Sequence, residues 1–467
     1  MDVRLEKVSD YIWRVPREGE MLVSGIVFAS ERMLGAIKGD ESLAQVANVA
    51  TLPGIQVASY AMPDIHWGYG FPIGGVAAFD VDEGVVSPGG VGYDISCGVR
   101  LIKTGLLYED IKERVSDLMH ALFRNVPTGV GSSRRDFRLS ESDEKKVLEL
   151  GARWAVERGF GDASDLLRIE DGGTFEGADP SYVSKRALER GMEQLGTLGS
   201  GNHFLEVGFV DEVYDKEAAD DLGLFEREVT IFIHTGSRGL GHQVCTDYIP
   251  KMLEASKRYG IRLRDKQLAC APINSKEGRS YLAAMAAAAN FAMANRQMIS
   301  HFAIETMLKF LSISPRALGA ALVYDVSHNT AKFEEYEIGG VKKRVLVHRK
   351  GATRAFPGQP VLIPGDMGRY SYVLVGTAES LVRSFGSTCH GAGRLMSRGE
   401  AKRSARSQDV ISELERKGIV AIGASMATIV EEMPSAYKDV AHVVDVCSKI
   451  GISKKVARIR PLGVIKG

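Results

Sequence analysis

The chain lacks long hydrophobic runs, has few cysteines and carries no excess of charge of either sign. No apolar stretch in its 467 residues reaches the roughly 18 residues that a membrane-spanning helix needs. The N-terminal sequence Met-Asp-Val-Arg-Leu-Glu-Lys has no apolar core of the kind that a secretory signal carries. The five cysteines, at positions 97, 245, 270, 389 and 447, are too few and too scattered for a disulfide framework. These absences predict a protein without a membrane partner, located in the reducing cytoplasm.

The charge balance limits where a nucleic acid could bind, and the order of segments indicates the fold class. Lys plus Arg and Asp plus Glu both number 59, so no global field attracts a polyanion and any nucleic-acid surface must be local. There is no internal repeat and no low-complexity linker. Predicted strands are not followed one for one by helices, which argues against a doubly wound sheet. We therefore expect an α+β fold, with residues 1–467 forming a single large mixed catalytic domain.

Local patterns predict the main elements. Short apolar runs predict strands, and amphipathic or Ala-rich stretches predict helices. Strands are expected at residues 22–29, 57–62, 75–79, 99–103, 228–234, 320–326, 361–368 and 371–376. Helices are expected at 42–50, 106–160 with a polar interruption at 129–136, 184–195, 278–311, 393–399 and 407–417. Loops are expected at 63–68 and 161–180, a hairpin around 337–344, and a basic tail at the end.

One glycine-rich stretch, Gly89–Arg100, carries a carboxylate and a thiol three positions apart, Asp94 and Cys97. Glycine suits a backbone that needs positive φ or close approach to a ligand. A carboxylate beside a thiolate is a start on a site for a borderline or softer divalent ion. Taken alone the pair is weak evidence, because a free cysteine usually packs in the core.

Three histidines, His203, His234 and His328, fall where a predicted strand meets a loop containing Gly or Asn, the place where ligands concentrate. Each alone is more often a hydrogen-bonded structural residue. With Asp94 and Cys97 they exceed the needs of one four-coordinate site. Five ligands with a bridging thiolate would serve two ions about 3.5–4 Å apart, the geometry that clamps phosphoryl oxygens. This donor set suits Mn, Fe, Co or Zn better than Mg or Ca.

A second group is the segment 389–394, Cys-His-Gly-Ala-Gly-Arg. Gly391 and Gly393 free backbone N–H groups to face an anion, and a helix expected directly afterwards would add the positive end of its dipole. His390 at the mouth of such a nest is placed to act as acid, base or nucleophile toward a phosphate. The ordinary alternative is a glycine-rich cap before a helix.

Basic residues form a third group. Residues 434–467 hold seven Lys or Arg against two Asp, the local surface that a polyanion needs, although the terminal Lys466 would ordinarily be solvated or frayed. Arg190 and Arg238 are candidate phosphate contacts because Arg suits bidentate phosphate binding, with surface ion pairing as the alternative. Two roles are open for His66: a metal ligand, or a residue that fixes a tautomer or packs.

Seven motifs, in this order, resemble one family. They lie at 62–68 (Met-Pro-Asp-Ile-His-Trp-Gly), 89–100, 198–206, 234–239, 325–329, 389–394 and 464–467. Over nearly its whole length the chain resembles the RtcB-type RNA ligases. The resemblance implies β-sheets around a central cleft, covered by helices. It also implies a GTP- and Mn²⁺-dependent ligase that joins 2′,3′-cyclic-phosphate or 3′-phosphate RNA ends to 5′-hydroxyl ends in tRNA splicing and RNA repair.

The resemblance further implies roles for single residues. Asp94, Cys97 and His203 would hold one Mn²⁺, and Cys97, His234 and His328 the second, with the thiolate as bridge. His390 matches the family's guanylylated histidine, which passes GMP to the RNA and forms an RNA(3′)pp(5′)G end. The implied GTP pocket comprises Asn202, His203, Phe204, Leu205, Glu206, His328, Asn329, Pro364, Gly365, Asp366, Met367, Ser371, His390, Gly391, Ala392, Gly393, Tyr437 and Lys466. Implied partners are tRNA exon halves, broken RNA ends and an archease-type activator. With RNA as the substrate, Arg190, Arg238 and Arg398 are the expected contacts for its phosphates.

At Asp366 the chain departs from the pattern of that family, where many relatives have a small hydroxyl residue. A carboxylate near a nucleotide is not neutral, so we expect it to point away from the phosphates or to contact the base. The residues themselves leave two other functions open. One is a dinuclear-metal phosphodiesterase or phosphatase acting on RNA ends, and the other is a nucleotide-binding regulatory module whose metal site is structural.

Overall fold

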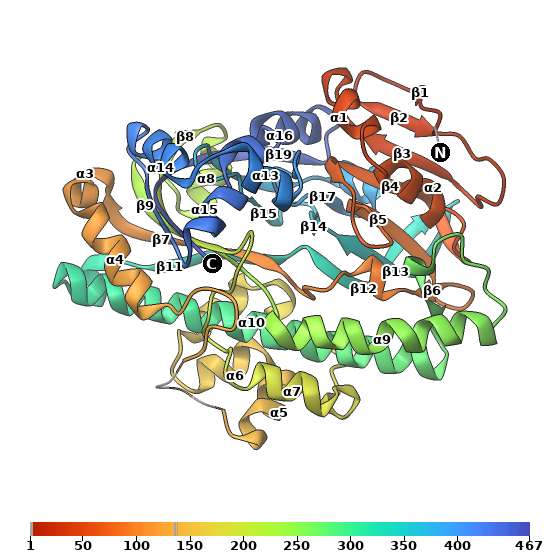
Figure 1. The fold of residues 1–467 in the computed structure, drawn as a ribbon, viewed down its shortest axis with the longest axis horizontal. Coiled ribbons are helices and arrows are strands. Elements are labelled where there is room, and N and C mark those ends of the chain that lie inside the picture. The colour runs from red at the N-terminus through yellow and green to blue at the C-terminus, as the bar shows by residue number, and fades with distance from the viewer. Residues whose placement is uncertain (1–2, 135–136, 138) are drawn as a thin grey trace.

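The computed structural model describes residues 3–134, 137 and 139–467 (Figure 1). Two large β-sheets form the centre of the molecule, and the long helices α9 (Arg238–Arg258) and α10 (Lys276–Leu311) run side by side beneath them in this view. This arrangement confirms the predicted mixed α+β fold. Within the described ranges no helix combines the length and apolar character needed to cross a membrane.

The first sheet has seven strands in the order β1-β2-β3-β4-β5-β13-β12. Neighbouring strands are antiparallel except β3 and β4. The strands are β1 (Glu6–Lys7), β2 (Ile12–Val15), β3 (Ser24–Phe28), β4 (Ile55–His66), β5 (Ile73–Asp80), β13 (Val341–Lys350) and β12 (Asn329–Ile338). The predicted hairpin around 337–344 is confirmed as the turn between β12 and β13.

The second sheet has eight strands, seven of them in the order β11-β7-β9-β8-β19-β16-β15. The eighth, β18, pairs in parallel with β19, and the other pairs are antiparallel. The strands are β11 (Ala321–Ser327), β7 (Gly98–Leu107), β9 (Glu228–Thr235), β8 (Phe204–Val213), β19 (Ser453–Lys466), β16 (Ser371–Gly376), β15 (Pro360–Ile363) and β18 (Val420–Gly423). Two small pairs complete the β-structure: β6 (Val85–Val86) with β10 (Ala271–Pro272), and β14 (Ala352–Arg354) with β17 (Ser387–Cys389).

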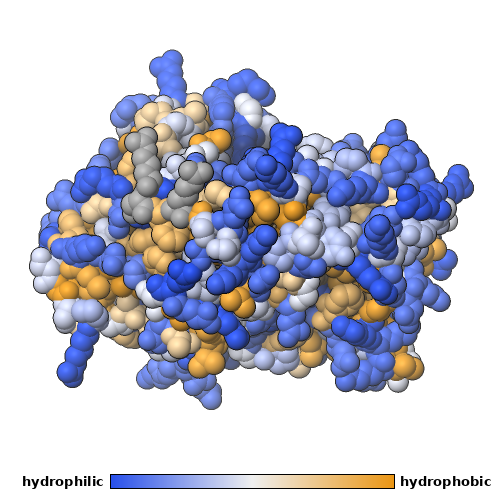
Figure 2. Space-filling view, turned by 90° about the horizontal axis from the view of Figure 1, so that it is seen from below, coloured by the Kyte–Doolittle hydropathy of each residue, from blue (hydrophilic) through white to orange (hydrophobic). Residues whose placement is uncertain are grey.

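Shorter helices cover the sheets and their edges. The α-helices are α1 (Leu34–Lys38), α2 (Ser42–Val49), α3 (Tyr108–Ile111), α4 (Val115–Asn125), α5 (Glu141–Leu150), α6 (Ala152–Glu157), α7 (Lys185–Gly191), α8 (Lys216–Leu222), α11 (Pro315–Leu318), α12 (Ala378–Ser384), α13 (Arg398–Ser404), α14 (Ser407–Arg416), α15 (Met426–Glu431) and α16 (Val440–Lys449). The 3₁₀ turns are η1 (Glu31–Met33), η2 (Pro88–Gly90), η3 (Lys112–Arg114), η4 (Ala163–Arg168), η5 (Glu170–Gly173), η6 (Pro180–Tyr182), η7 (Lys266–Leu268) and η8 (Pro434–Ala436). Figure 2 views the molecule from the side of α9 and α10 and shows a face where hydrophilic side chains predominate and apolar ones are interspersed.

The Ala-rich helix α10 confirms the prediction for residues 278–311. Its 36 residues span about 54 Å at 1.5 Å per residue. Ser275 caps the helix, its side chain accepting a hydrogen bond from the Gly278 N–H. A run of small side chains, Ala287–Ala289, is buried within the largest core cluster, because small residues let a helix approach its neighbours closely. The helix thus forms a rigid base for the sheet above it.

Several boundaries differ from the predictions. Residues 63–66 belong to β4 rather than to a loop: Pro63 lies where the β4–β5 register is irregular, a place where a missing N–H is tolerated. The strand expected at 361–368 ends at Ile363, before Pro364-Gly365. The 161–180 loop contains three short 3₁₀ turns. The interruption expected at 129–136 lies partly outside the described residues, at 135–136.

The predicted basic tail is wrong. The last strand, β19, lies inside the second sheet between β8 and β16, and Lys466 is only 5% exposed. Several of its cations are neutralised, since Arg458 pairs with Asp211 and Lys454 with Asp215. The chain end is therefore a structural strand rather than a free surface for a polyanion.

Candidate active site

Strand register gathers the predicted metal ligands at one edge of the second sheet. Cys97 immediately precedes β7, and His328 immediately follows β11. Because β7 pairs antiparallel with both β11 and β9, Gly98 lies opposite Ser327 on one side and Thr235 on the other. Directly opposed residues in such a ladder lie about 4.5–5.5 Å apart. The sequence positions at strand ends therefore become neighbours in space.

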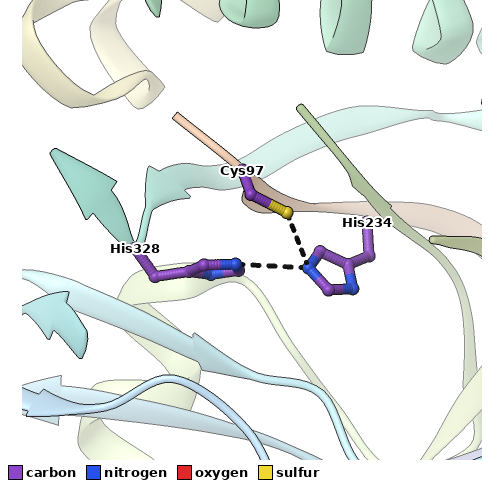
Figure 3. A group of neighbouring side chains, drawn as sticks. All are labelled: Cys97, His234 and His328. Atoms are coloured by element: carbon purple, nitrogen blue, oxygen red, sulfur yellow. Dashed lines mark hydrogen bonds between the residues drawn. The ribbon is translucent and has the colours of Figure 1, made fainter. Parts of the chain in front are cut away.

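Cys97 is the shared centre of this cluster. Its Sγ lies 3.3 Å from His234 Nε2 (Figure 3) and 3.5 Å from His203 Nε2. His234 Nε2 in turn lies 3.3 Å from His328 Nε2, and His203 Nε2 lies 2.8 Å from Asp94 Oδ2. The potential ligand atoms form two groups that share the thiol, Asp94–Cys97–His203 and Cys97–His234–His328, with the atoms of each group within 4.8 Å of one another.

Backbone carbonyls orient two of the imidazoles. His203 Nδ1 faces the Leu198 carbonyl at 3.1 Å, and His234 Nδ1 faces the Asn202 carbonyl at 3.2 Å. Because a carbonyl only accepts hydrogen bonds, each Nδ1 carries the proton and each Nε2 lone pair points into the cluster. Lone pairs that converge on a carboxylate and a thiol lack donors to satisfy them, and a cation would satisfy them all.

Burial keeps this cluster poor in positive charge. It lowers the pKa of His234 and His328 well below the usual range for histidine. Burial, with the neighbouring Asp94 as a second cause, raises the pKa of the Cys97 thiol well above its usual range. Neutral imidazoles are the form that binds metal ions, and a bound cation deprotonates a coordinating thiol. The donor set fits divalent ions of the Mn, Fe, Co or Zn kind.

His390 faces the cluster from the other side. It follows β17, and its ring centre lies 5.1 Å from that of His328. Its Nδ1 lies 2.5 Å from Oδ2 of the fully buried Asp64. Burial would raise the pKa of Asp64, but the charge of His390 and its hydrogen bonds outweigh that and lower it. The carboxylate therefore holds a proton on Nδ1 and leaves Nε2 available as a nucleophile or base.

Asp64 was missed by the sequence reasoning, although it lies in the quoted segment 62–68. The signal was a carboxylate in a run that also holds His66, whose Nδ1 faces the Asp64 carbonyl at 2.9 Å. Burial lowers the pKa of His66 to about 4. Its ring lies beside His390 in one cavity, apart from the two ligand groups that share Cys97.

The glycine nest expected at 391–393 is wrong in two respects. No helix follows directly: α13 begins only at Arg398. The amide of Gly391, one of those expected to face an anion, instead donates to Asp64 Oδ2 at 3.2 Å, as the amide of His390 does at 2.9 Å. Gly393, at φ 73°, packs so closely that a Cβ would lie 2.3 Å from the Asp64 carbonyl oxygen. The loop therefore binds the Asp64 carboxylate through its backbone amides, and this contact fixes the position of His390.

A cavity of about 240 Å³ opens beside His390. The residues of the implied GTP pocket that line it are Asn202, Phe204, Pro364, Gly365, Asp366, His390, Gly391, Ala392, Gly393, Tyr437 and Lys466. A neighbouring cavity of similar size is lined by His328, Asn329 and the ligands Asp94 and Cys97, and it shares Asn202 and His390 with the first. Residues far apart in the sequence thus surround one continuous region.

The remaining residues of that set lie behind the cavity wall. Leu205 is fully buried in the largest core cluster, and Met367 is buried in another. Ser371 Oγ accepts a hydrogen bond from the Gly365 N–H at 3.2 Å. His203 faces Asp94 in the metal cluster. These residues support the wall and do not line the opening.

Glu206 and Lys466 are close enough to shift each other's pKa, and Lys466 lines the cavity. Burial raises the pKa of Glu206 to about 8 and lowers that of Lys466. Oε1 of Glu206 is buried and has no hydrogen-bond partner within the described residues. Such an orphaned acceptor is costly unless a ligand supplies a donor. Lys466 Nζ donates to the Asn202 carbonyl at 3.2 Å.

Asp366 lines the same cavity and is held by its own loop. Its Oδ1 accepts from the Gly368 N–H at 2.9 Å, and its Oδ2 lies 3.2 Å from Arg369 Nη1. Burial raises the pKa of Asp366, with Arg369 opposing the rise. The partner arginine and the turn reduce the repulsion that a bare carboxylate would exert on a phosphate.

The three candidate RNA arginines lie on two sides of the site. Arg238 begins α9 with its Nε donating to Thr197 Oγ1 at 3.2 Å, and burial lowers its pKa to about 10. Arg190 donates to Gln243 Oε1 at 3.0 Å on the neighbouring helix pair. Arg398 lies instead beside the His390 cavity, 3.5 Å from a Glu432 carboxylate oxygen. The structure therefore does not bring all three together.

These features define an enzyme with a candidate divalent-metal centre beside a carboxylate-held histidine and a ligand cavity. The family described as "tRNA-splicing ligase RtcB" matches residues 45–467. The tRNA-splicing ligase RtcB of Archaeoglobus fulgidus is 54% identical over the full length of both chains, and that of Thermococcus kodakarensis is 50% identical over 100% of this chain and 99% of its own. The RNA-splicing ligase RtcB of Mycobacterium bovis is 53% identical over 91% of this chain and 100% of its own. The chain belongs to the RtcB family of tRNA-splicing ligases and is an RNA ligase.

Proposed function

We propose that this RNA ligase uses GTP and two Mn²⁺ ions to join RNA 3′-phosphate or 2′,3′-cyclic-phosphate ends to 5′-hydroxyl ends. The observation that carries the proposal is the contact of His390 Nδ1 with the buried carboxylate of Asp64. The ring centre of His390 lies 5.1 Å from that of His328, a proposed metal ligand. When a fixed carboxylate accepts a hydrogen bond from one ring N–H of a histidine, the other ring nitrogen is left as a nucleophile. Its position beside both the metal ligands and the cavity fits attack on a nucleotide phosphate.

The two ligand groups that share Cys97 would hold the ions, Asp94 and His203 on one side and His234 and His328 on the other. Two such ions supply charge neutralisation for phosphate oxygens when bound. Lys466 and Arg394 add fixed positive charge at the cavity wall. Both cations lie near Glu432, whose pKa they lower against the effect of burial.

In the proposed sequence the Nε2 of His390 forms a bond to the α-phosphorus of GTP, and the bond to pyrophosphate breaks. An oxygen of the RNA 3′-phosphate then attacks that phosphorus, which releases His390 and leaves an RNA(3′)pp(5′)G end. The 5′-hydroxyl oxygen of the second strand attacks the RNA 3′-phosphorus, and GMP leaves. Asp64 keeps the proton on Nδ1 throughout, so that the same nitrogen reacts in each turnover. A cyclic phosphate end must first be opened by water.

Guanine selection is assigned to Glu206. Its Oε1 is a buried acceptor without a partner among the described residues. Guanine carries N–H donors, at N1 and at the amino group on C2, that adenine lacks. A site built for those donors rejects a base without them, because the acceptor would stay unpaired. GTP is therefore expected to support ligation far better than ATP.

The remaining parts of the proposal concern the domain organisation, the partners and the location of the protein. Residues 1–467 are proposed to act as one catalytic domain, with tRNA exon halves or broken RNA ends as substrates and an archease-type protein as activator. Arg190, Arg238 and Arg398 are the proposed RNA contacts. All five cysteines are free, which supports a cytoplasmic location because free thiols persist in reducing compartments.

The proposal is tested by ligation with defined ends. One strand carries a 3′-phosphate or a 2′,3′-cyclic phosphate, the other a 5′-hydroxyl, and GTP, ATP, Mn²⁺ and Mg²⁺ are varied one at a time. We expect joined product only with GTP and with Mn²⁺ or a similarly soft ion. Hydrolysis of the cyclic phosphate without joining would instead favour the phosphodiesterase interpretation, and equal rates with ATP would remove Glu206 from guanine selection.

A further inference from the structure

A second cavity, of about 750 Å³, lies away from the metal centre. It is enclosed by β12, β13, the first turns of α10 and the segment that follows η5. The volume falls in the roughly 300–1,000 Å³ range of small-molecule sites. None of its lining residues belongs to the metal cluster or to the cavity beside His390. The cavity is therefore a separate site with its own chemistry.

Two phenyl rings and two guanidinium groups characterise this cavity. Phe175 and Phe333 both line it, and Phe333 is 41% exposed although it is a large apolar side chain. The Arg344 guanidinium lies over the Phe333 ring, 4.8 Å from its centre, and Lys332 Nζ lies 5.2 Å from the centre of Phe175. Exposed rings flanked by cations are the elements that proteins use to stack nucleobases and hold phosphates.

The charges divide into a neutralised floor and a basic rim. On the floor, Lys332 pairs with Glu170 at 2.7 Å and with Asp171 at 2.6 Å, and Arg354 pairs with the same two carboxylates. At the rim, the exposed Arg279 and Arg344 form no ion pair within 4.0 Å in the described ranges, although Arg344 lies opposite Glu335 in the β12–β13 ladder and helps to lower its pKa. Glu176 is the other acidic residue at the opening. Two guanidinium groups thus remain available to an anionic ligand.

Strand β12 and the carboxylate of Glu170 both connect the cavity with the active centre. β12 starts at Asn329, whose Nδ2 donates to the Asp94 carbonyl at 2.9 Å, and it reaches the cavity at residues 331–333. At about 3.3 Å per residue, Phe333 lies roughly 13 Å along the strand from Asn329. Glu170, which pairs with Lys332, also accepts the Ser327 N–H at 3.0 Å. A strand a few nucleotides long can cover such a separation.

We propose that this cavity binds a nucleotide unit, with a base against Phe333 and Phe175 and a phosphate at Arg279 and Arg344. The chemistry is common to a nucleotide within an RNA strand and to a free nucleotide. An RNA strand whose end occupies the active centre is the source that fits the distance along β12, and this assignment rests on the proposed function. The cavity then contributes affinity for RNA without touching the reacting ends.

The test compares a 12-nucleotide and a 3-nucleotide oligoadenylate, each with a 3′-phosphate, on the full-length protein. The variants are Arg279→Gln with Arg344→Gln, and Phe333→Ala. Their matched controls are Arg316→Gln, an exposed arginine without an ion pair in the described part of the chain, and Phe225→Ala, a ring of similar exposure (46%). We expect both cavity variants to weaken 12-mer binding about 10-fold, because base stacking and phosphate contacts are lost. Ligation of the 3-mer is expected to stay within about twofold of wild type.

Salt dependence gives a second readout. Losing the one phosphate contact that the two arginines share should reduce the slope of log affinity against log salt by about 0.7. An unchanged 12-mer affinity and slope in the double variant would overturn the proposal. So would an equal loss for the 3-mer, because that places the defect in the active centre.

Titration with AMP separates the two sources. AMP binding that disappears in Phe333→Ala while 12-mer affinity is retained would assign the cavity to a free nucleotide and overturn the strand assignment. If wild-type protein binds the 12-mer through these residues but ligates neither substrate, the proposed function fails and the cavity proposal stands.

Discussion

The two halves of the active centre are built in different ways. The metal half consists of side chains at adjoining ends of four neighbouring strands in one sheet, gathered around Cys97. The nucleotide half collects residues from loops and strand ends of several elements, including 364–366 and 390–393. In the metal half imidazole, thiol and carboxylate ligand atoms converge on one another. In the nucleotide half charged groups already pair, as Asp64 does with His390 and Arg394 with Glu432. We therefore expect the first half to depend on the proposed ions, whereas the second is largely organised by contacts within the chain.

The largest expected effect tests the metal half. Cys97→Ala removes the one ligand atom common to both groups, so we expect both ions to be lost on dialysis and ligation to fall by at least about 1,000-fold, the scale for loss of a charge-stabilising group. Metal content by mass spectrometry and ligation rate measure this. The control Cys270→Ala, also buried but outside the cluster, should keep its metal. Retention of two tightly bound ions by Cys97→Ala would contradict the shared-ligand account.

The next effect tests the nucleotide half without touching the metals. Asp64→Asn keeps the size of the side chain but removes the charge that fixes the His390 proton on Nδ1, so we expect guanylylation to slow by about 100- to 1,000-fold; the comparable change in a serine protease costs about 10⁴. Metal content should stay unchanged, and the pH profile of guanylylation should shift. The exposed Asp82→Asn serves as control. A variant with the wild-type rate and profile would show that Asp64 has only a structural part.

A smaller effect concerns Glu206, which belongs to the wall of the nucleotide half. Glu206→Gln should reduce kcat/KM for GTP by about 10- to 100-fold, the cost of losing a hydrogen bond to a charged acceptor. Discrimination against ATP should fall with it. The exposed Glu226→Gln is the matched control. An unchanged GTP preference would place guanine recognition elsewhere.

The raised pKa of Glu206, about 8 against an ordinary 4.5, also predicts a pH dependence. Without nucleotide the folded protein holds this proton between those values while the unfolded chain has released it, so this group stabilises the fold at low pH. That contribution is lost as pH rises from about 4.5 to about 8. Denaturation of wild type and Glu206→Gln across this window should show a slope that the variant lacks. A parallel pair of curves would refute the shift.

The smallest effect concerns Asp366. Its carboxylate is held by Arg369 and by the Gly368 N–H, so its repulsion of a triphosphate is mostly offset. Asp366→Asn is expected to lower the KM for GTP only two- to threefold, with kcat unchanged, as a steady-state titration would show. A change of more than tenfold would mean that the carboxylate contacts the nucleotide directly.

The metal half was also the half that sequence patterns described best. Gly98, His234 and His328 lie at predicted strand ends, and antiparallel register brings such ends together. What the pattern did not contain was the order of strands, which brings these strand ends to one edge of the sheet. Long-range pairing depends on the whole fold and leaves no local signature.

In the nucleotide half local patterns misled. Glycines at 391 and 393 predicted a nest followed by a helix, but the tight packing of this loop against Asp64 determines its path. The pattern of short apolar runs predicts a loop at 63–68, which includes Asp64, whereas an irregular register admits Pro63 and Asp64 into β4. The buried terminal Lys466 was also unexpected, because the neighbours that bury β19 are distant in sequence.

The most direct test of the account is covalent labelling with GTP that carries radioactive phosphorus at the α-position, in the presence of Mn²⁺. The account predicts one label per chain, lost in acid, stable in alkali, absent from His390→Ala and strongly slowed in Asp64→Asn. A label of the same stoichiometry in His390→Ala would contradict the assignment of the nucleophile and, with it, the division of the active centre into its two halves.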